Sequence, residues 1–293
     1  MPTIKLLLAA TLILFQGCRT AKISQEIKPT VRNTSTHIGG TYSDTPIIGA
    51  SKNAVIYVKG TSIGINSTGP IDTFIANWIK PLSDSLNAQM NQIIGFTAEE
   101  FRPIRSKGRI SESQQHKATL ARLVSDYTLK GAQEFARTYQ FPMPELAVLN
   151  HNGLRNAIDS GNITLGAVFE VMPFDNEVVL LVLSGTQMIE LFNYIAQIGG
   201  TPLSGGELYL DSQQFVSARI NGNAFDSRRS YCIATVDFMQ GGGDGFTMLK
   251  NPKRSIQTGK FLRDVIIEQM QLEMAASPQS LKPRNNPRIF HQP

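Results

Sequence analysis

An uninterrupted apolar run, Val178–Leu183 (VVLLVL), lies in the second half of the chain. A run of this length and composition predicts a strand that is buried on both faces. The residues that follow, Ser184 and Gln187, have the spacing of a capping box, which predicts that a helix begins there and continues through Met188–Ile195. The chain must therefore build a core deep enough to enclose a whole strand, and its 293 residues are sufficient for that.

Periodicity predicts further strands and helices around this centre. Apolar residues at helical spacing predict helices over Ile71–Met90, where Pro81 should kink or restart the helix, and over Lys117–Arg137. Thr258 is expected to cap a last helix, Gly199–Gly206 is expected to be a loop, and Asn221–Asn223 is expected to form a hairpin turn. The expected further strands are Ala54–Val58, Leu146–Leu149, Glu207–Leu210, Phe215–Ile220 and Tyr231–Val236. Neighbouring strands mixed with several helices predict an α+β fold, a single compact domain with a mixed β-sheet.

The N-terminus has the features of an export signal. The apolar run Leu6–Phe15 has ten residues, about half of the roughly 20 that a membrane-spanning helix needs. It follows a basic start and ends at Gly17-Cys18, which predicts a bacterial lipoprotein signal over residues 1–18, with Cys18 as the lipidated residue. The alternative is an ordinary signal peptide with an incidental cysteine. We expect an exported protein that is lipid-anchored to a cell envelope membrane, periplasmic or surface facing, and does not span the membrane.

The remaining boundaries follow from composition. Residues 19–46 are rich in small and polar residues and predict a flexible tether, residues 47–275 form the domain, and the proline-rich residues 276–293 predict a loose basic tail. Two cysteines, Cys18 and Cys232, exclude a disulfide framework and a cysteine-rich zinc site, and Cys232 should be a small buried hydrophobe. A net charge of +5 without a basic stripe gives no indication of nucleic acid as a partner.

Three segments place polar or aromatic groups where predicted strands begin or end. Leu149–Arg155 is a polar turn after a strand, Met172–Asn176 precedes the buried apolar run, and Asp237–Phe246 is a glycine-rich run after another strand. Glycines allow a backbone to approach a ligand closely, and an arginine adds a planar donor fork. Taken singly, the first segment is typical of a tight turn with a surface arginine and the second of a core aromatic residue, while the third is as compatible with a flexible surface loop as with a site.

Taken together, the three segments resemble the C-terminal domain of the 5′-nucleotidase / UDP-sugar hydrolase family. That pattern reads Asn-Gly-Gly-Gly-Ile-Arg, then Pro-Phe-Gly-Asn, then Asn-Phe-x-x-x-Gly-Gly-Asp-Gly-Phe, and the resemblance covers about residues 104–271. It implies that Phe174 and Phe238 sandwich a nucleotide base, while Asp244 holds the ribose hydroxyls. By the same resemblance, Asn150, Arg155 and, on a helix start, Arg122 belong to the substrate-binding set.

The chain departs from the family pattern at several positions. His151 and Asn152 replace two glycines, Asp175 replaces a glycine, Asp237 replaces an asparagine, and His116-Lys117 stands where the family has Arg-Glu. Asparagine tolerates left-handed backbone geometry, so the turn can survive, whereas His151 could crowd the pocket.

The metallophosphatase motifs of two-domain family members are absent from the sequence. The chain has no Asp-x-His, Asn-His-Glu or His-x-His, and its four histidines are scattered at His37, His116, His151 and His291. We therefore expect no cofactor and no catalytic residue in this chain, with divalent metals carried by a separate metallophosphatase subunit. The leading hypothesis is the nucleotide-recognition half of a split 5′-nucleotidase-type hydrolase. The alternatives are a stand-alone nucleoside or nucleotide-sugar binding lipoprotein, and a degenerate domain kept for structure or interaction.

Overall fold

The computed structural model describes residues 73–104, 108–284 and 286–292. These residues belong to one compact unit, which spans residues 68–293. The expected signal peptide with Cys18, the tether over residues 19–46 and the expected strand Ala54–Val58 lie outside the described residues.

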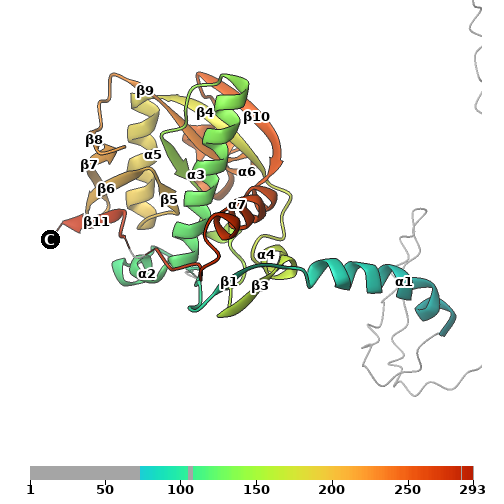
Figure 1. Cartoon of the computed structure of the whole chain (residues 1–293). Helices are drawn as coiled ribbons and strands as arrows, with labels where there is room; N and C mark the ends of the chain where they lie inside the picture. The colour runs from blue at the N-terminus through green and yellow to red at the C-terminus, as the bar shows by residue number, and fades with distance from the viewer. Residues whose placement is uncertain (1–72, 105–107, 285, 293) are drawn as a thin grey trace, which may run out of the picture. The chain divides into compact units, whose positions relative to one another are not determined.

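A five-stranded mixed sheet forms the centre of the unit (Figure 1). The neighbours β9 and β2 run parallel, whereas every other adjacent pair in this sheet runs antiparallel. In sheet order, the strands are β10 (Arg254–Phe261), β4 (Glu177–Ser184), β9 (Ser230–Val236), β2 (Leu146–Val148) and β5 (Leu203–Ser204). The apolar run is the core of β4, next to the middle strand, so the prediction of a buried strand is confirmed.

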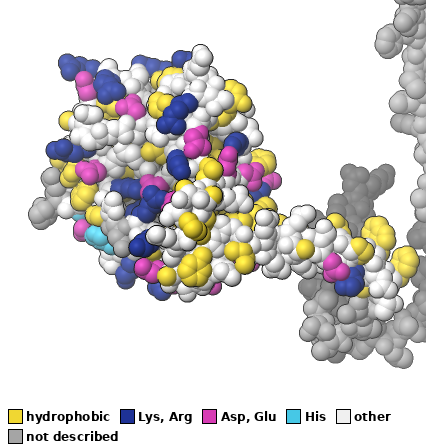
Figure 2. Space-filling view, in the orientation of Figure 1, with side chains coloured by type: hydrophobic (Ala, Val, Ile, Leu, Met, Phe, Trp, Pro, Cys, Tyr) yellow, Lys and Arg dark blue, Asp and Glu magenta, His cyan; other side chains and the backbone are white. Residues whose placement is uncertain are grey.

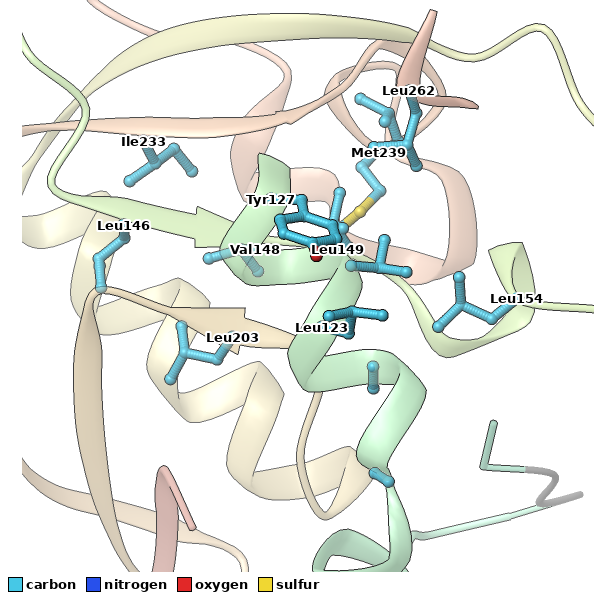
Figure 3. Packing of buried hydrophobic residues seen from close by; sticks show 14 of the residues in the cluster. Leu123, Tyr127, Leu146, Val148, Leu149, Leu154, Leu203, Ile233, Met239 and Leu262 are labelled. Carbon is cyan, nitrogen blue, oxygen red and sulfur yellow. The ribbon is translucent and has the colours of Figure 1, made fainter. Parts of the chain in front are cut away.

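Helices cover both faces of this sheet, which is why β4 is apolar at successive positions rather than at alternate ones. Leu180 packs in a cluster with Cys232 and with residues of α3 (Thr119–Tyr139). Its neighbours Val179 and Leu181 point to the other face and join a cluster that includes α5 (Gly185–Ile198). Figure 3 shows Leu123 and Tyr127 of α3 packed among core residues of β2 and the segments after β2 and β9.

The buried cysteine behaves as predicted. Cys232 is 4% exposed, and burial raises the pKa of its thiol to about 12, so the thiol stays protonated at neutral pH. The capping box of α5 is also confirmed, because Ser184 and Gln187 exchange side-chain and backbone hydrogen bonds.

A second sheet contains the C-terminal residues, and the prediction of a loose basic tail over residues 276–293 is wrong for its described part. Leu281 and Ile289 are buried, and Arg288 forms an ion pair with Asp126 of α3 at 2.7 Å. Burial of two large apolar residues and a paired arginine fixes a segment whose composition is otherwise typical of a tail. In sheet order, the strands are β11 (Ile289–Gln292), β6 (Gly206–Asp211), β7 (Gln214–Ile220) and β8 (Asn223–Ala224).

The turn between β7 and β8 is the predicted hairpin, with Asn221 and Gly222 both at positive φ. The expected loop Gly199–Gly206 contains the short strand β5, which pairs with β2. Thr258 does not cap a helix: it lies in β10, its hydroxyl donates to the Val178 carbonyl, and pairing of β10 with β4 overrides the local capping signal.

The remaining elements include a separate two-stranded antiparallel sheet, formed by Ile93–Thr97 and Gly161–Thr164. The expected helix around Pro81 forms one element, α1, and the expected helix Lys117–Arg137 is divided between α2 and α3. These further elements are α1 (Thr73–Met90), β1 (Ile93–Thr97), α2 (Glu112–Lys117), β3 (Gly161–Thr164), α4 (Leu165–Val171), α6 (Asp237–Gln240) and α7 (Leu262–Ala276). In the described part of the chain, no helix has both the length and the apolar character that a membrane crossing needs. The α+β fold with a mixed sheet is confirmed.

Candidate functional site

Sheet topology brings the three predicted segments to one edge of the central sheet. Strands β2 and β9 are parallel neighbours, so the residues after both strands leave the sheet at the same edge. Strand β4 is antiparallel to β9 and pairs Val178 with Val236, so the segment before β4 arrives at that edge as well. Loop positions at the carboxyl ends of strands are common ligand sites in sheets that are covered on both faces.

A carboxylate links the first and third segments. The Asn150 side-chain amide donates a hydrogen bond of 2.6 Å to Asp244 Oδ2, and the Asn152 amide donates a second one of 3.2 Å to the same oxygen. Asn150 is 8% exposed, whereas Asp244 is exposed, so the amide holds the carboxylate from the buried side. A Cβ on Gly153 would approach Asn150 Oδ1 to 3.0 Å, which explains the glycine that the turn retains.

The glycine-rich run presents Asp244 in a constrained geometry. Gly242, Asp244 and Gly245 all have positive φ, with Asp244 at 49°. The Tyr194 hydroxyl of α5 donates to the Asp244 backbone carbonyl at 2.5 Å, and a Cβ on Gly245 would lie 2.2 Å from that hydroxyl oxygen. A non-glycine residue in the left-handed region is uncommon, and such strain concentrates at functional sites.

The second and third segments each carry an exposed phenylalanine. Phe174 is 42% exposed and Phe238 is 44% exposed, although both lie on segments with buried neighbours. The Arg155 guanidinium lies 5.9 Å from the centroid of the Phe174 ring, and the Phe238 ring covers Gly243, where a Cβ would come within 2.4 Å of it. Large exposed rings at a polar loop cluster are the residue type on which a flat base stacks.

Two of the departures from the family pattern have structural roles. Asp237 Oδ1 accepts hydrogen bonds from the backbone N–H groups of Glu177 and Phe238, at 3.1 and 2.7 Å, and so joins the third segment to the start of β4. Asp175 forms an ion pair of 2.8 Å with Arg263 of α7, which fixes the loop that carries Phe174.

In the described part of the chain, the hydrogen bonds of the Arg122 side chain go to other partners than the remaining five predicted residues. Its guanidinium donates to the backbone carbonyls of Gln115, His116 and Arg284, so it holds the end of α2 and the C-terminal segment together. Burial, and then the nearby Arg288, lower its pKa. The assignment of Arg122 to a substrate contact stays a prediction.

A cavity of about 250 Å³ opens behind Asp244. Its walls combine apolar side chains with amide, hydroxyl and carboxylate groups. The lining residues are Ile104, Gly108, Ile110, Asn150, His151, Asn152, Tyr194, Ile198, Thr201, Asp244 and Phe246.

His151 is the unusual member of this lining. Both ring nitrogens are buried, and among the described residues neither has a hydrogen-bond partner. Burial lowers the pKa of His151 to about 3, so the imidazole is neutral at physiological pH. Burial and the nearby Asp244 raise the pKa of Tyr194, which keeps its hydroxyl protonated as a donor.

A larger cleft of about 550 Å³ lies beside the C-terminal segment and contains no predicted site residue. Four of its charged side chains are paired with one another: Asp126 with Arg284 and Arg288, and Glu273 with Arg284. These ion pairs serve the packing of the segment.

Within the described ranges, no group of three or more His, Cys, Asp or Glu side chains lies close enough to hold a metal ion. The described residues therefore do not fit a two-metal phosphatase centre.

Sequence reasoning missed Tyr194 and Thr201 as members of the cavity. Tyr194 lies on the predicted helix after β4, but only the packing of α5 against the glycine-rich run brings its hydroxyl to Asp244. Thr201 donates to the Leu149 carbonyl from an expected loop. Neither residue stands in a motif, so no sequence signal was available.

Comparison with known families identifies the domain. Residues 93–251, more than half of the chain, match the family model described as the 5′-nucleotidase C-terminal domain.

Individual relatives agree with this match. The chain is 25% identical to an apyrase from Tabanus yao over 73% of its own length, and 27% identical to the silent protein UshA(0) from Salmonella typhimurium over 68%. It spans only 42% and 35% of the lengths of these relatives. A 5′-nucleotidase precursor from Thermus thermophilus has a similar fold, with a TM-score of 0.58 and 22% identity over 76% of this chain and 44% of that one.

Proposed function

Because the chain belongs to the 5′-nucleotidase C-terminal domain family, we propose that it is the nucleotide-recognition half of a 5′-nucleotidase-type hydrolase. In this proposal, the base binds between Phe174 and Phe238. A separate metallophosphatase chain supplies the metals and the attacking water, and it hydrolyses the phosphate ester.

The contact between Asn150 and Asp244 carries this proposal. An asparagine amide after β2 and a second one from Asn152 both donate to one carboxylate oxygen, which fixes the orientation of the carboxylate and leaves Oδ1 to accept from a ligand. A carboxylate held in this way suits a neighbouring pair of sugar hydroxyls, each of which can donate.

The flanking groups fit the other parts of a nucleotide. Two exposed rings provide faces for stacking, at roughly 1–3 kcal/mol per base. Arg155, beside Phe174, offers a permanent cation for a phosphate oxygen at the rim.

The partner follows from the chemistry that a nucleotidase needs. A two-metal hydrolase requires converging His and carboxylate ligands, and the described residues hold no such group. The relatives are more than twice as long as the part that this chain matches, which leaves room in them for a further domain. We propose that, for this protein, a separate metallophosphatase chain performs the role of that further domain.

Reconstitution tests the proposal. The purified full chain, a metallophosphatase chain of the same organism and their mixture would each be assayed for phosphate release from AMP and UDP-glucose with Mn²⁺, Co²⁺ or Zn²⁺. We expect turnover of at least about 1 s⁻¹ from the mixture and none from this chain alone. Nucleoside binding without turnover in any mixture would instead establish a capture protein. Turnover by this chain alone would overturn the proposal that a separate chain performs the hydrolysis.

We further propose that the protein is exported and lipid-anchored through Cys18. Support comes from the sequence of residues 1–18, a basic start and an apolar run of ten residues that ends at Gly17-Cys18.

A further inference from the structure

One face of α1 consists of large apolar side chains that are exposed. Trp78 and Leu82 expose 80% and 74% of their surface, and Ile79 and Leu86 expose about half. The four residues recur at helical spacing, and we call them the α1 stripe. Figure 2 shows hydrophobic side chains on the surface of this helix.

The opposite face of α1 is polar, and its side chains bond to one another. Lys80 forms an ion pair with Asp84 at 3.0 Å, and Asn87 Nδ2 donates to Ser83 Oγ at 3.5 Å. No residue of α1 is buried. Because helices in proteins gain most of their stability from packing an apolar face, an exposed stripe of this size marks a surface that binds a partner.

The stripe is connected to the candidate site through α4. A Cβ on Gly166 of α4 would lie 3.1 Å from the Met90 carbonyl oxygen, so the end of α1 packs closely on α4. Helix α4 leads directly into the loop that carries Phe174. A partner held by α1 is therefore held beside the helix that supports the candidate substrate loop.

The position of α1 in the chain indicates the partner. Helix α1 ends at Met90, and the match to the C-terminal domain begins at residue 93. Since the matched family model describes a C-terminal domain, we expect the further length of the relatives to precede the equivalent of this boundary. We infer that the α1 stripe binds in an apolar groove of the metallophosphatase subunit, an inference that rests on the proposed function.

Trp78 makes the test direct, because it is the only tryptophan in the chain. Its fluorescence would be followed in the full chain during titration with a metallophosphatase chain of the same organism, one that carries Asp-x-His, Asn-His-Glu and His-x-His motifs but has no C-terminal nucleotidase domain. We expect a blue shift that saturates at one to one, because the indole moves from water into an apolar groove. Light scattering after size-exclusion chromatography would measure the mass of the complex.

Paired variants separate the two faces of the helix. Leu82→Lys places a charge in the stripe and should weaken the complex at least tenfold, with an equal loss of AMP turnover at limiting concentration. Asn87→Lys, on the polar face, should change both by less than twofold. Nucleoside binding to the isolated chain should be the same in both variants and in the wild type.

The outcomes distinguish this inference from the proposed function. If the pair hydrolyses AMP and Leu82→Lys has no effect, the stripe is not the docking surface, while the proposed function stands. If no metallophosphatase chain gives turnover with the wild type, both fail. The inference is also overturned if Trp78 is already shielded in the isolated chain and becomes exposed when residues 19–66 are deleted. Self-association that Leu82→Lys abolishes, or a blue shift caused by anionic vesicles alone, overturns it as well.

Discussion

Asn150 and Asp244 are 94 positions apart in the sequence, and their side chains meet in a hydrogen bond of 2.6 Å. The contact joins the turn after β2 to the glycine-rich run after β9. It aligns the carboxylate that we expect to accept the sugar hydroxyls of a nucleoside.

Removal of the Asp244 charge should weaken ligand binding. Asp244→Asn keeps the shape of the side chain but loses a charged acceptor, and hydrogen bonds to charged groups contribute about 1.5–3 kcal/mol. We expect adenosine to bind roughly 10- to 100-fold more weakly by calorimetry. The matched control is Asp211→Asn, an exposed carboxylate on β6, which should bind as the wild type does. Equal affinities of the two variants would remove Asp244 from the site.

Phe238 should contribute to binding rather than to stability. Phe238→Ala should weaken the free energy of nucleoside binding by about 1–3 kcal/mol. It should lower the melting temperature only slightly, because the ring is already 44% exposed. Phe192→Ala, a fully buried phenylalanine of α5, should instead lower the free energy of unfolding by about 3–5 kcal/mol. A large drop in melting temperature for Phe238→Ala with unchanged affinity would make this ring a core residue.

His151 should make the stability depend on pH. Its pKa in the folded state is about 3, below its ordinary value of 6.5, so the unfolded chain takes up the proton first as the pH falls. Stability should be complete above about pH 6.5 and decline toward pH 3 by at most about 1.4 kcal/mol per pH unit. His151→Gln cannot titrate and should show a shallower decline in urea unfolding between pH 7 and pH 4. The exposed His116→Gln should follow the wild type, and identical slopes for all three proteins would contradict the prediction.

The C-terminal segment should stabilise the fold. Deletion of residues 277–293 removes the buried Leu281 and Ile289, each worth about 1.5–3 kcal/mol, and leaves Asp126 without its arginines. We expect the free energy of unfolding to fall by roughly 3–6 kcal/mol in denaturant titrations. Substitution of the exposed Lys282 by Gln should have no such effect. A truncated protein as stable as the full chain would mean that the segment is only loosely held.

Membrane attachment should depend on Cys18. In Cys18→Ser, the protein should remain soluble or unprocessed while the domain still folds, since Cys232 is the only cysteine within the described residues and is buried. Cell fractionation with detection of the domain measures this. A variant that sediments with membranes as the wild type does would exclude lipidation at this residue.

Several local elements and three short motifs could be predicted from the sequence alone. The run Val178–Leu183, the capping box at Ser184 and the turn at Asn221-Gly222 each depend on periodicity or on backbone geometry within a few residues. The three motif segments were recognised in the same way, because each is a short pattern of residue types.

Which of these segments meet depends on long-range contacts in the folded chain. Strand β9 pairs in parallel with β2 and antiparallel with β4, and this pairing brings the three segments to one edge of the sheet. The order of the strands arises because residues far apart in the chain are buried together. For the same reason, Thr258 lies in a strand instead of capping a helix, and Arg122 donates to the backbone carbonyls of Gln115 and His116. The polar-looking C-terminal residues are held by long-range contacts to α3 and β6, which no local pattern encodes.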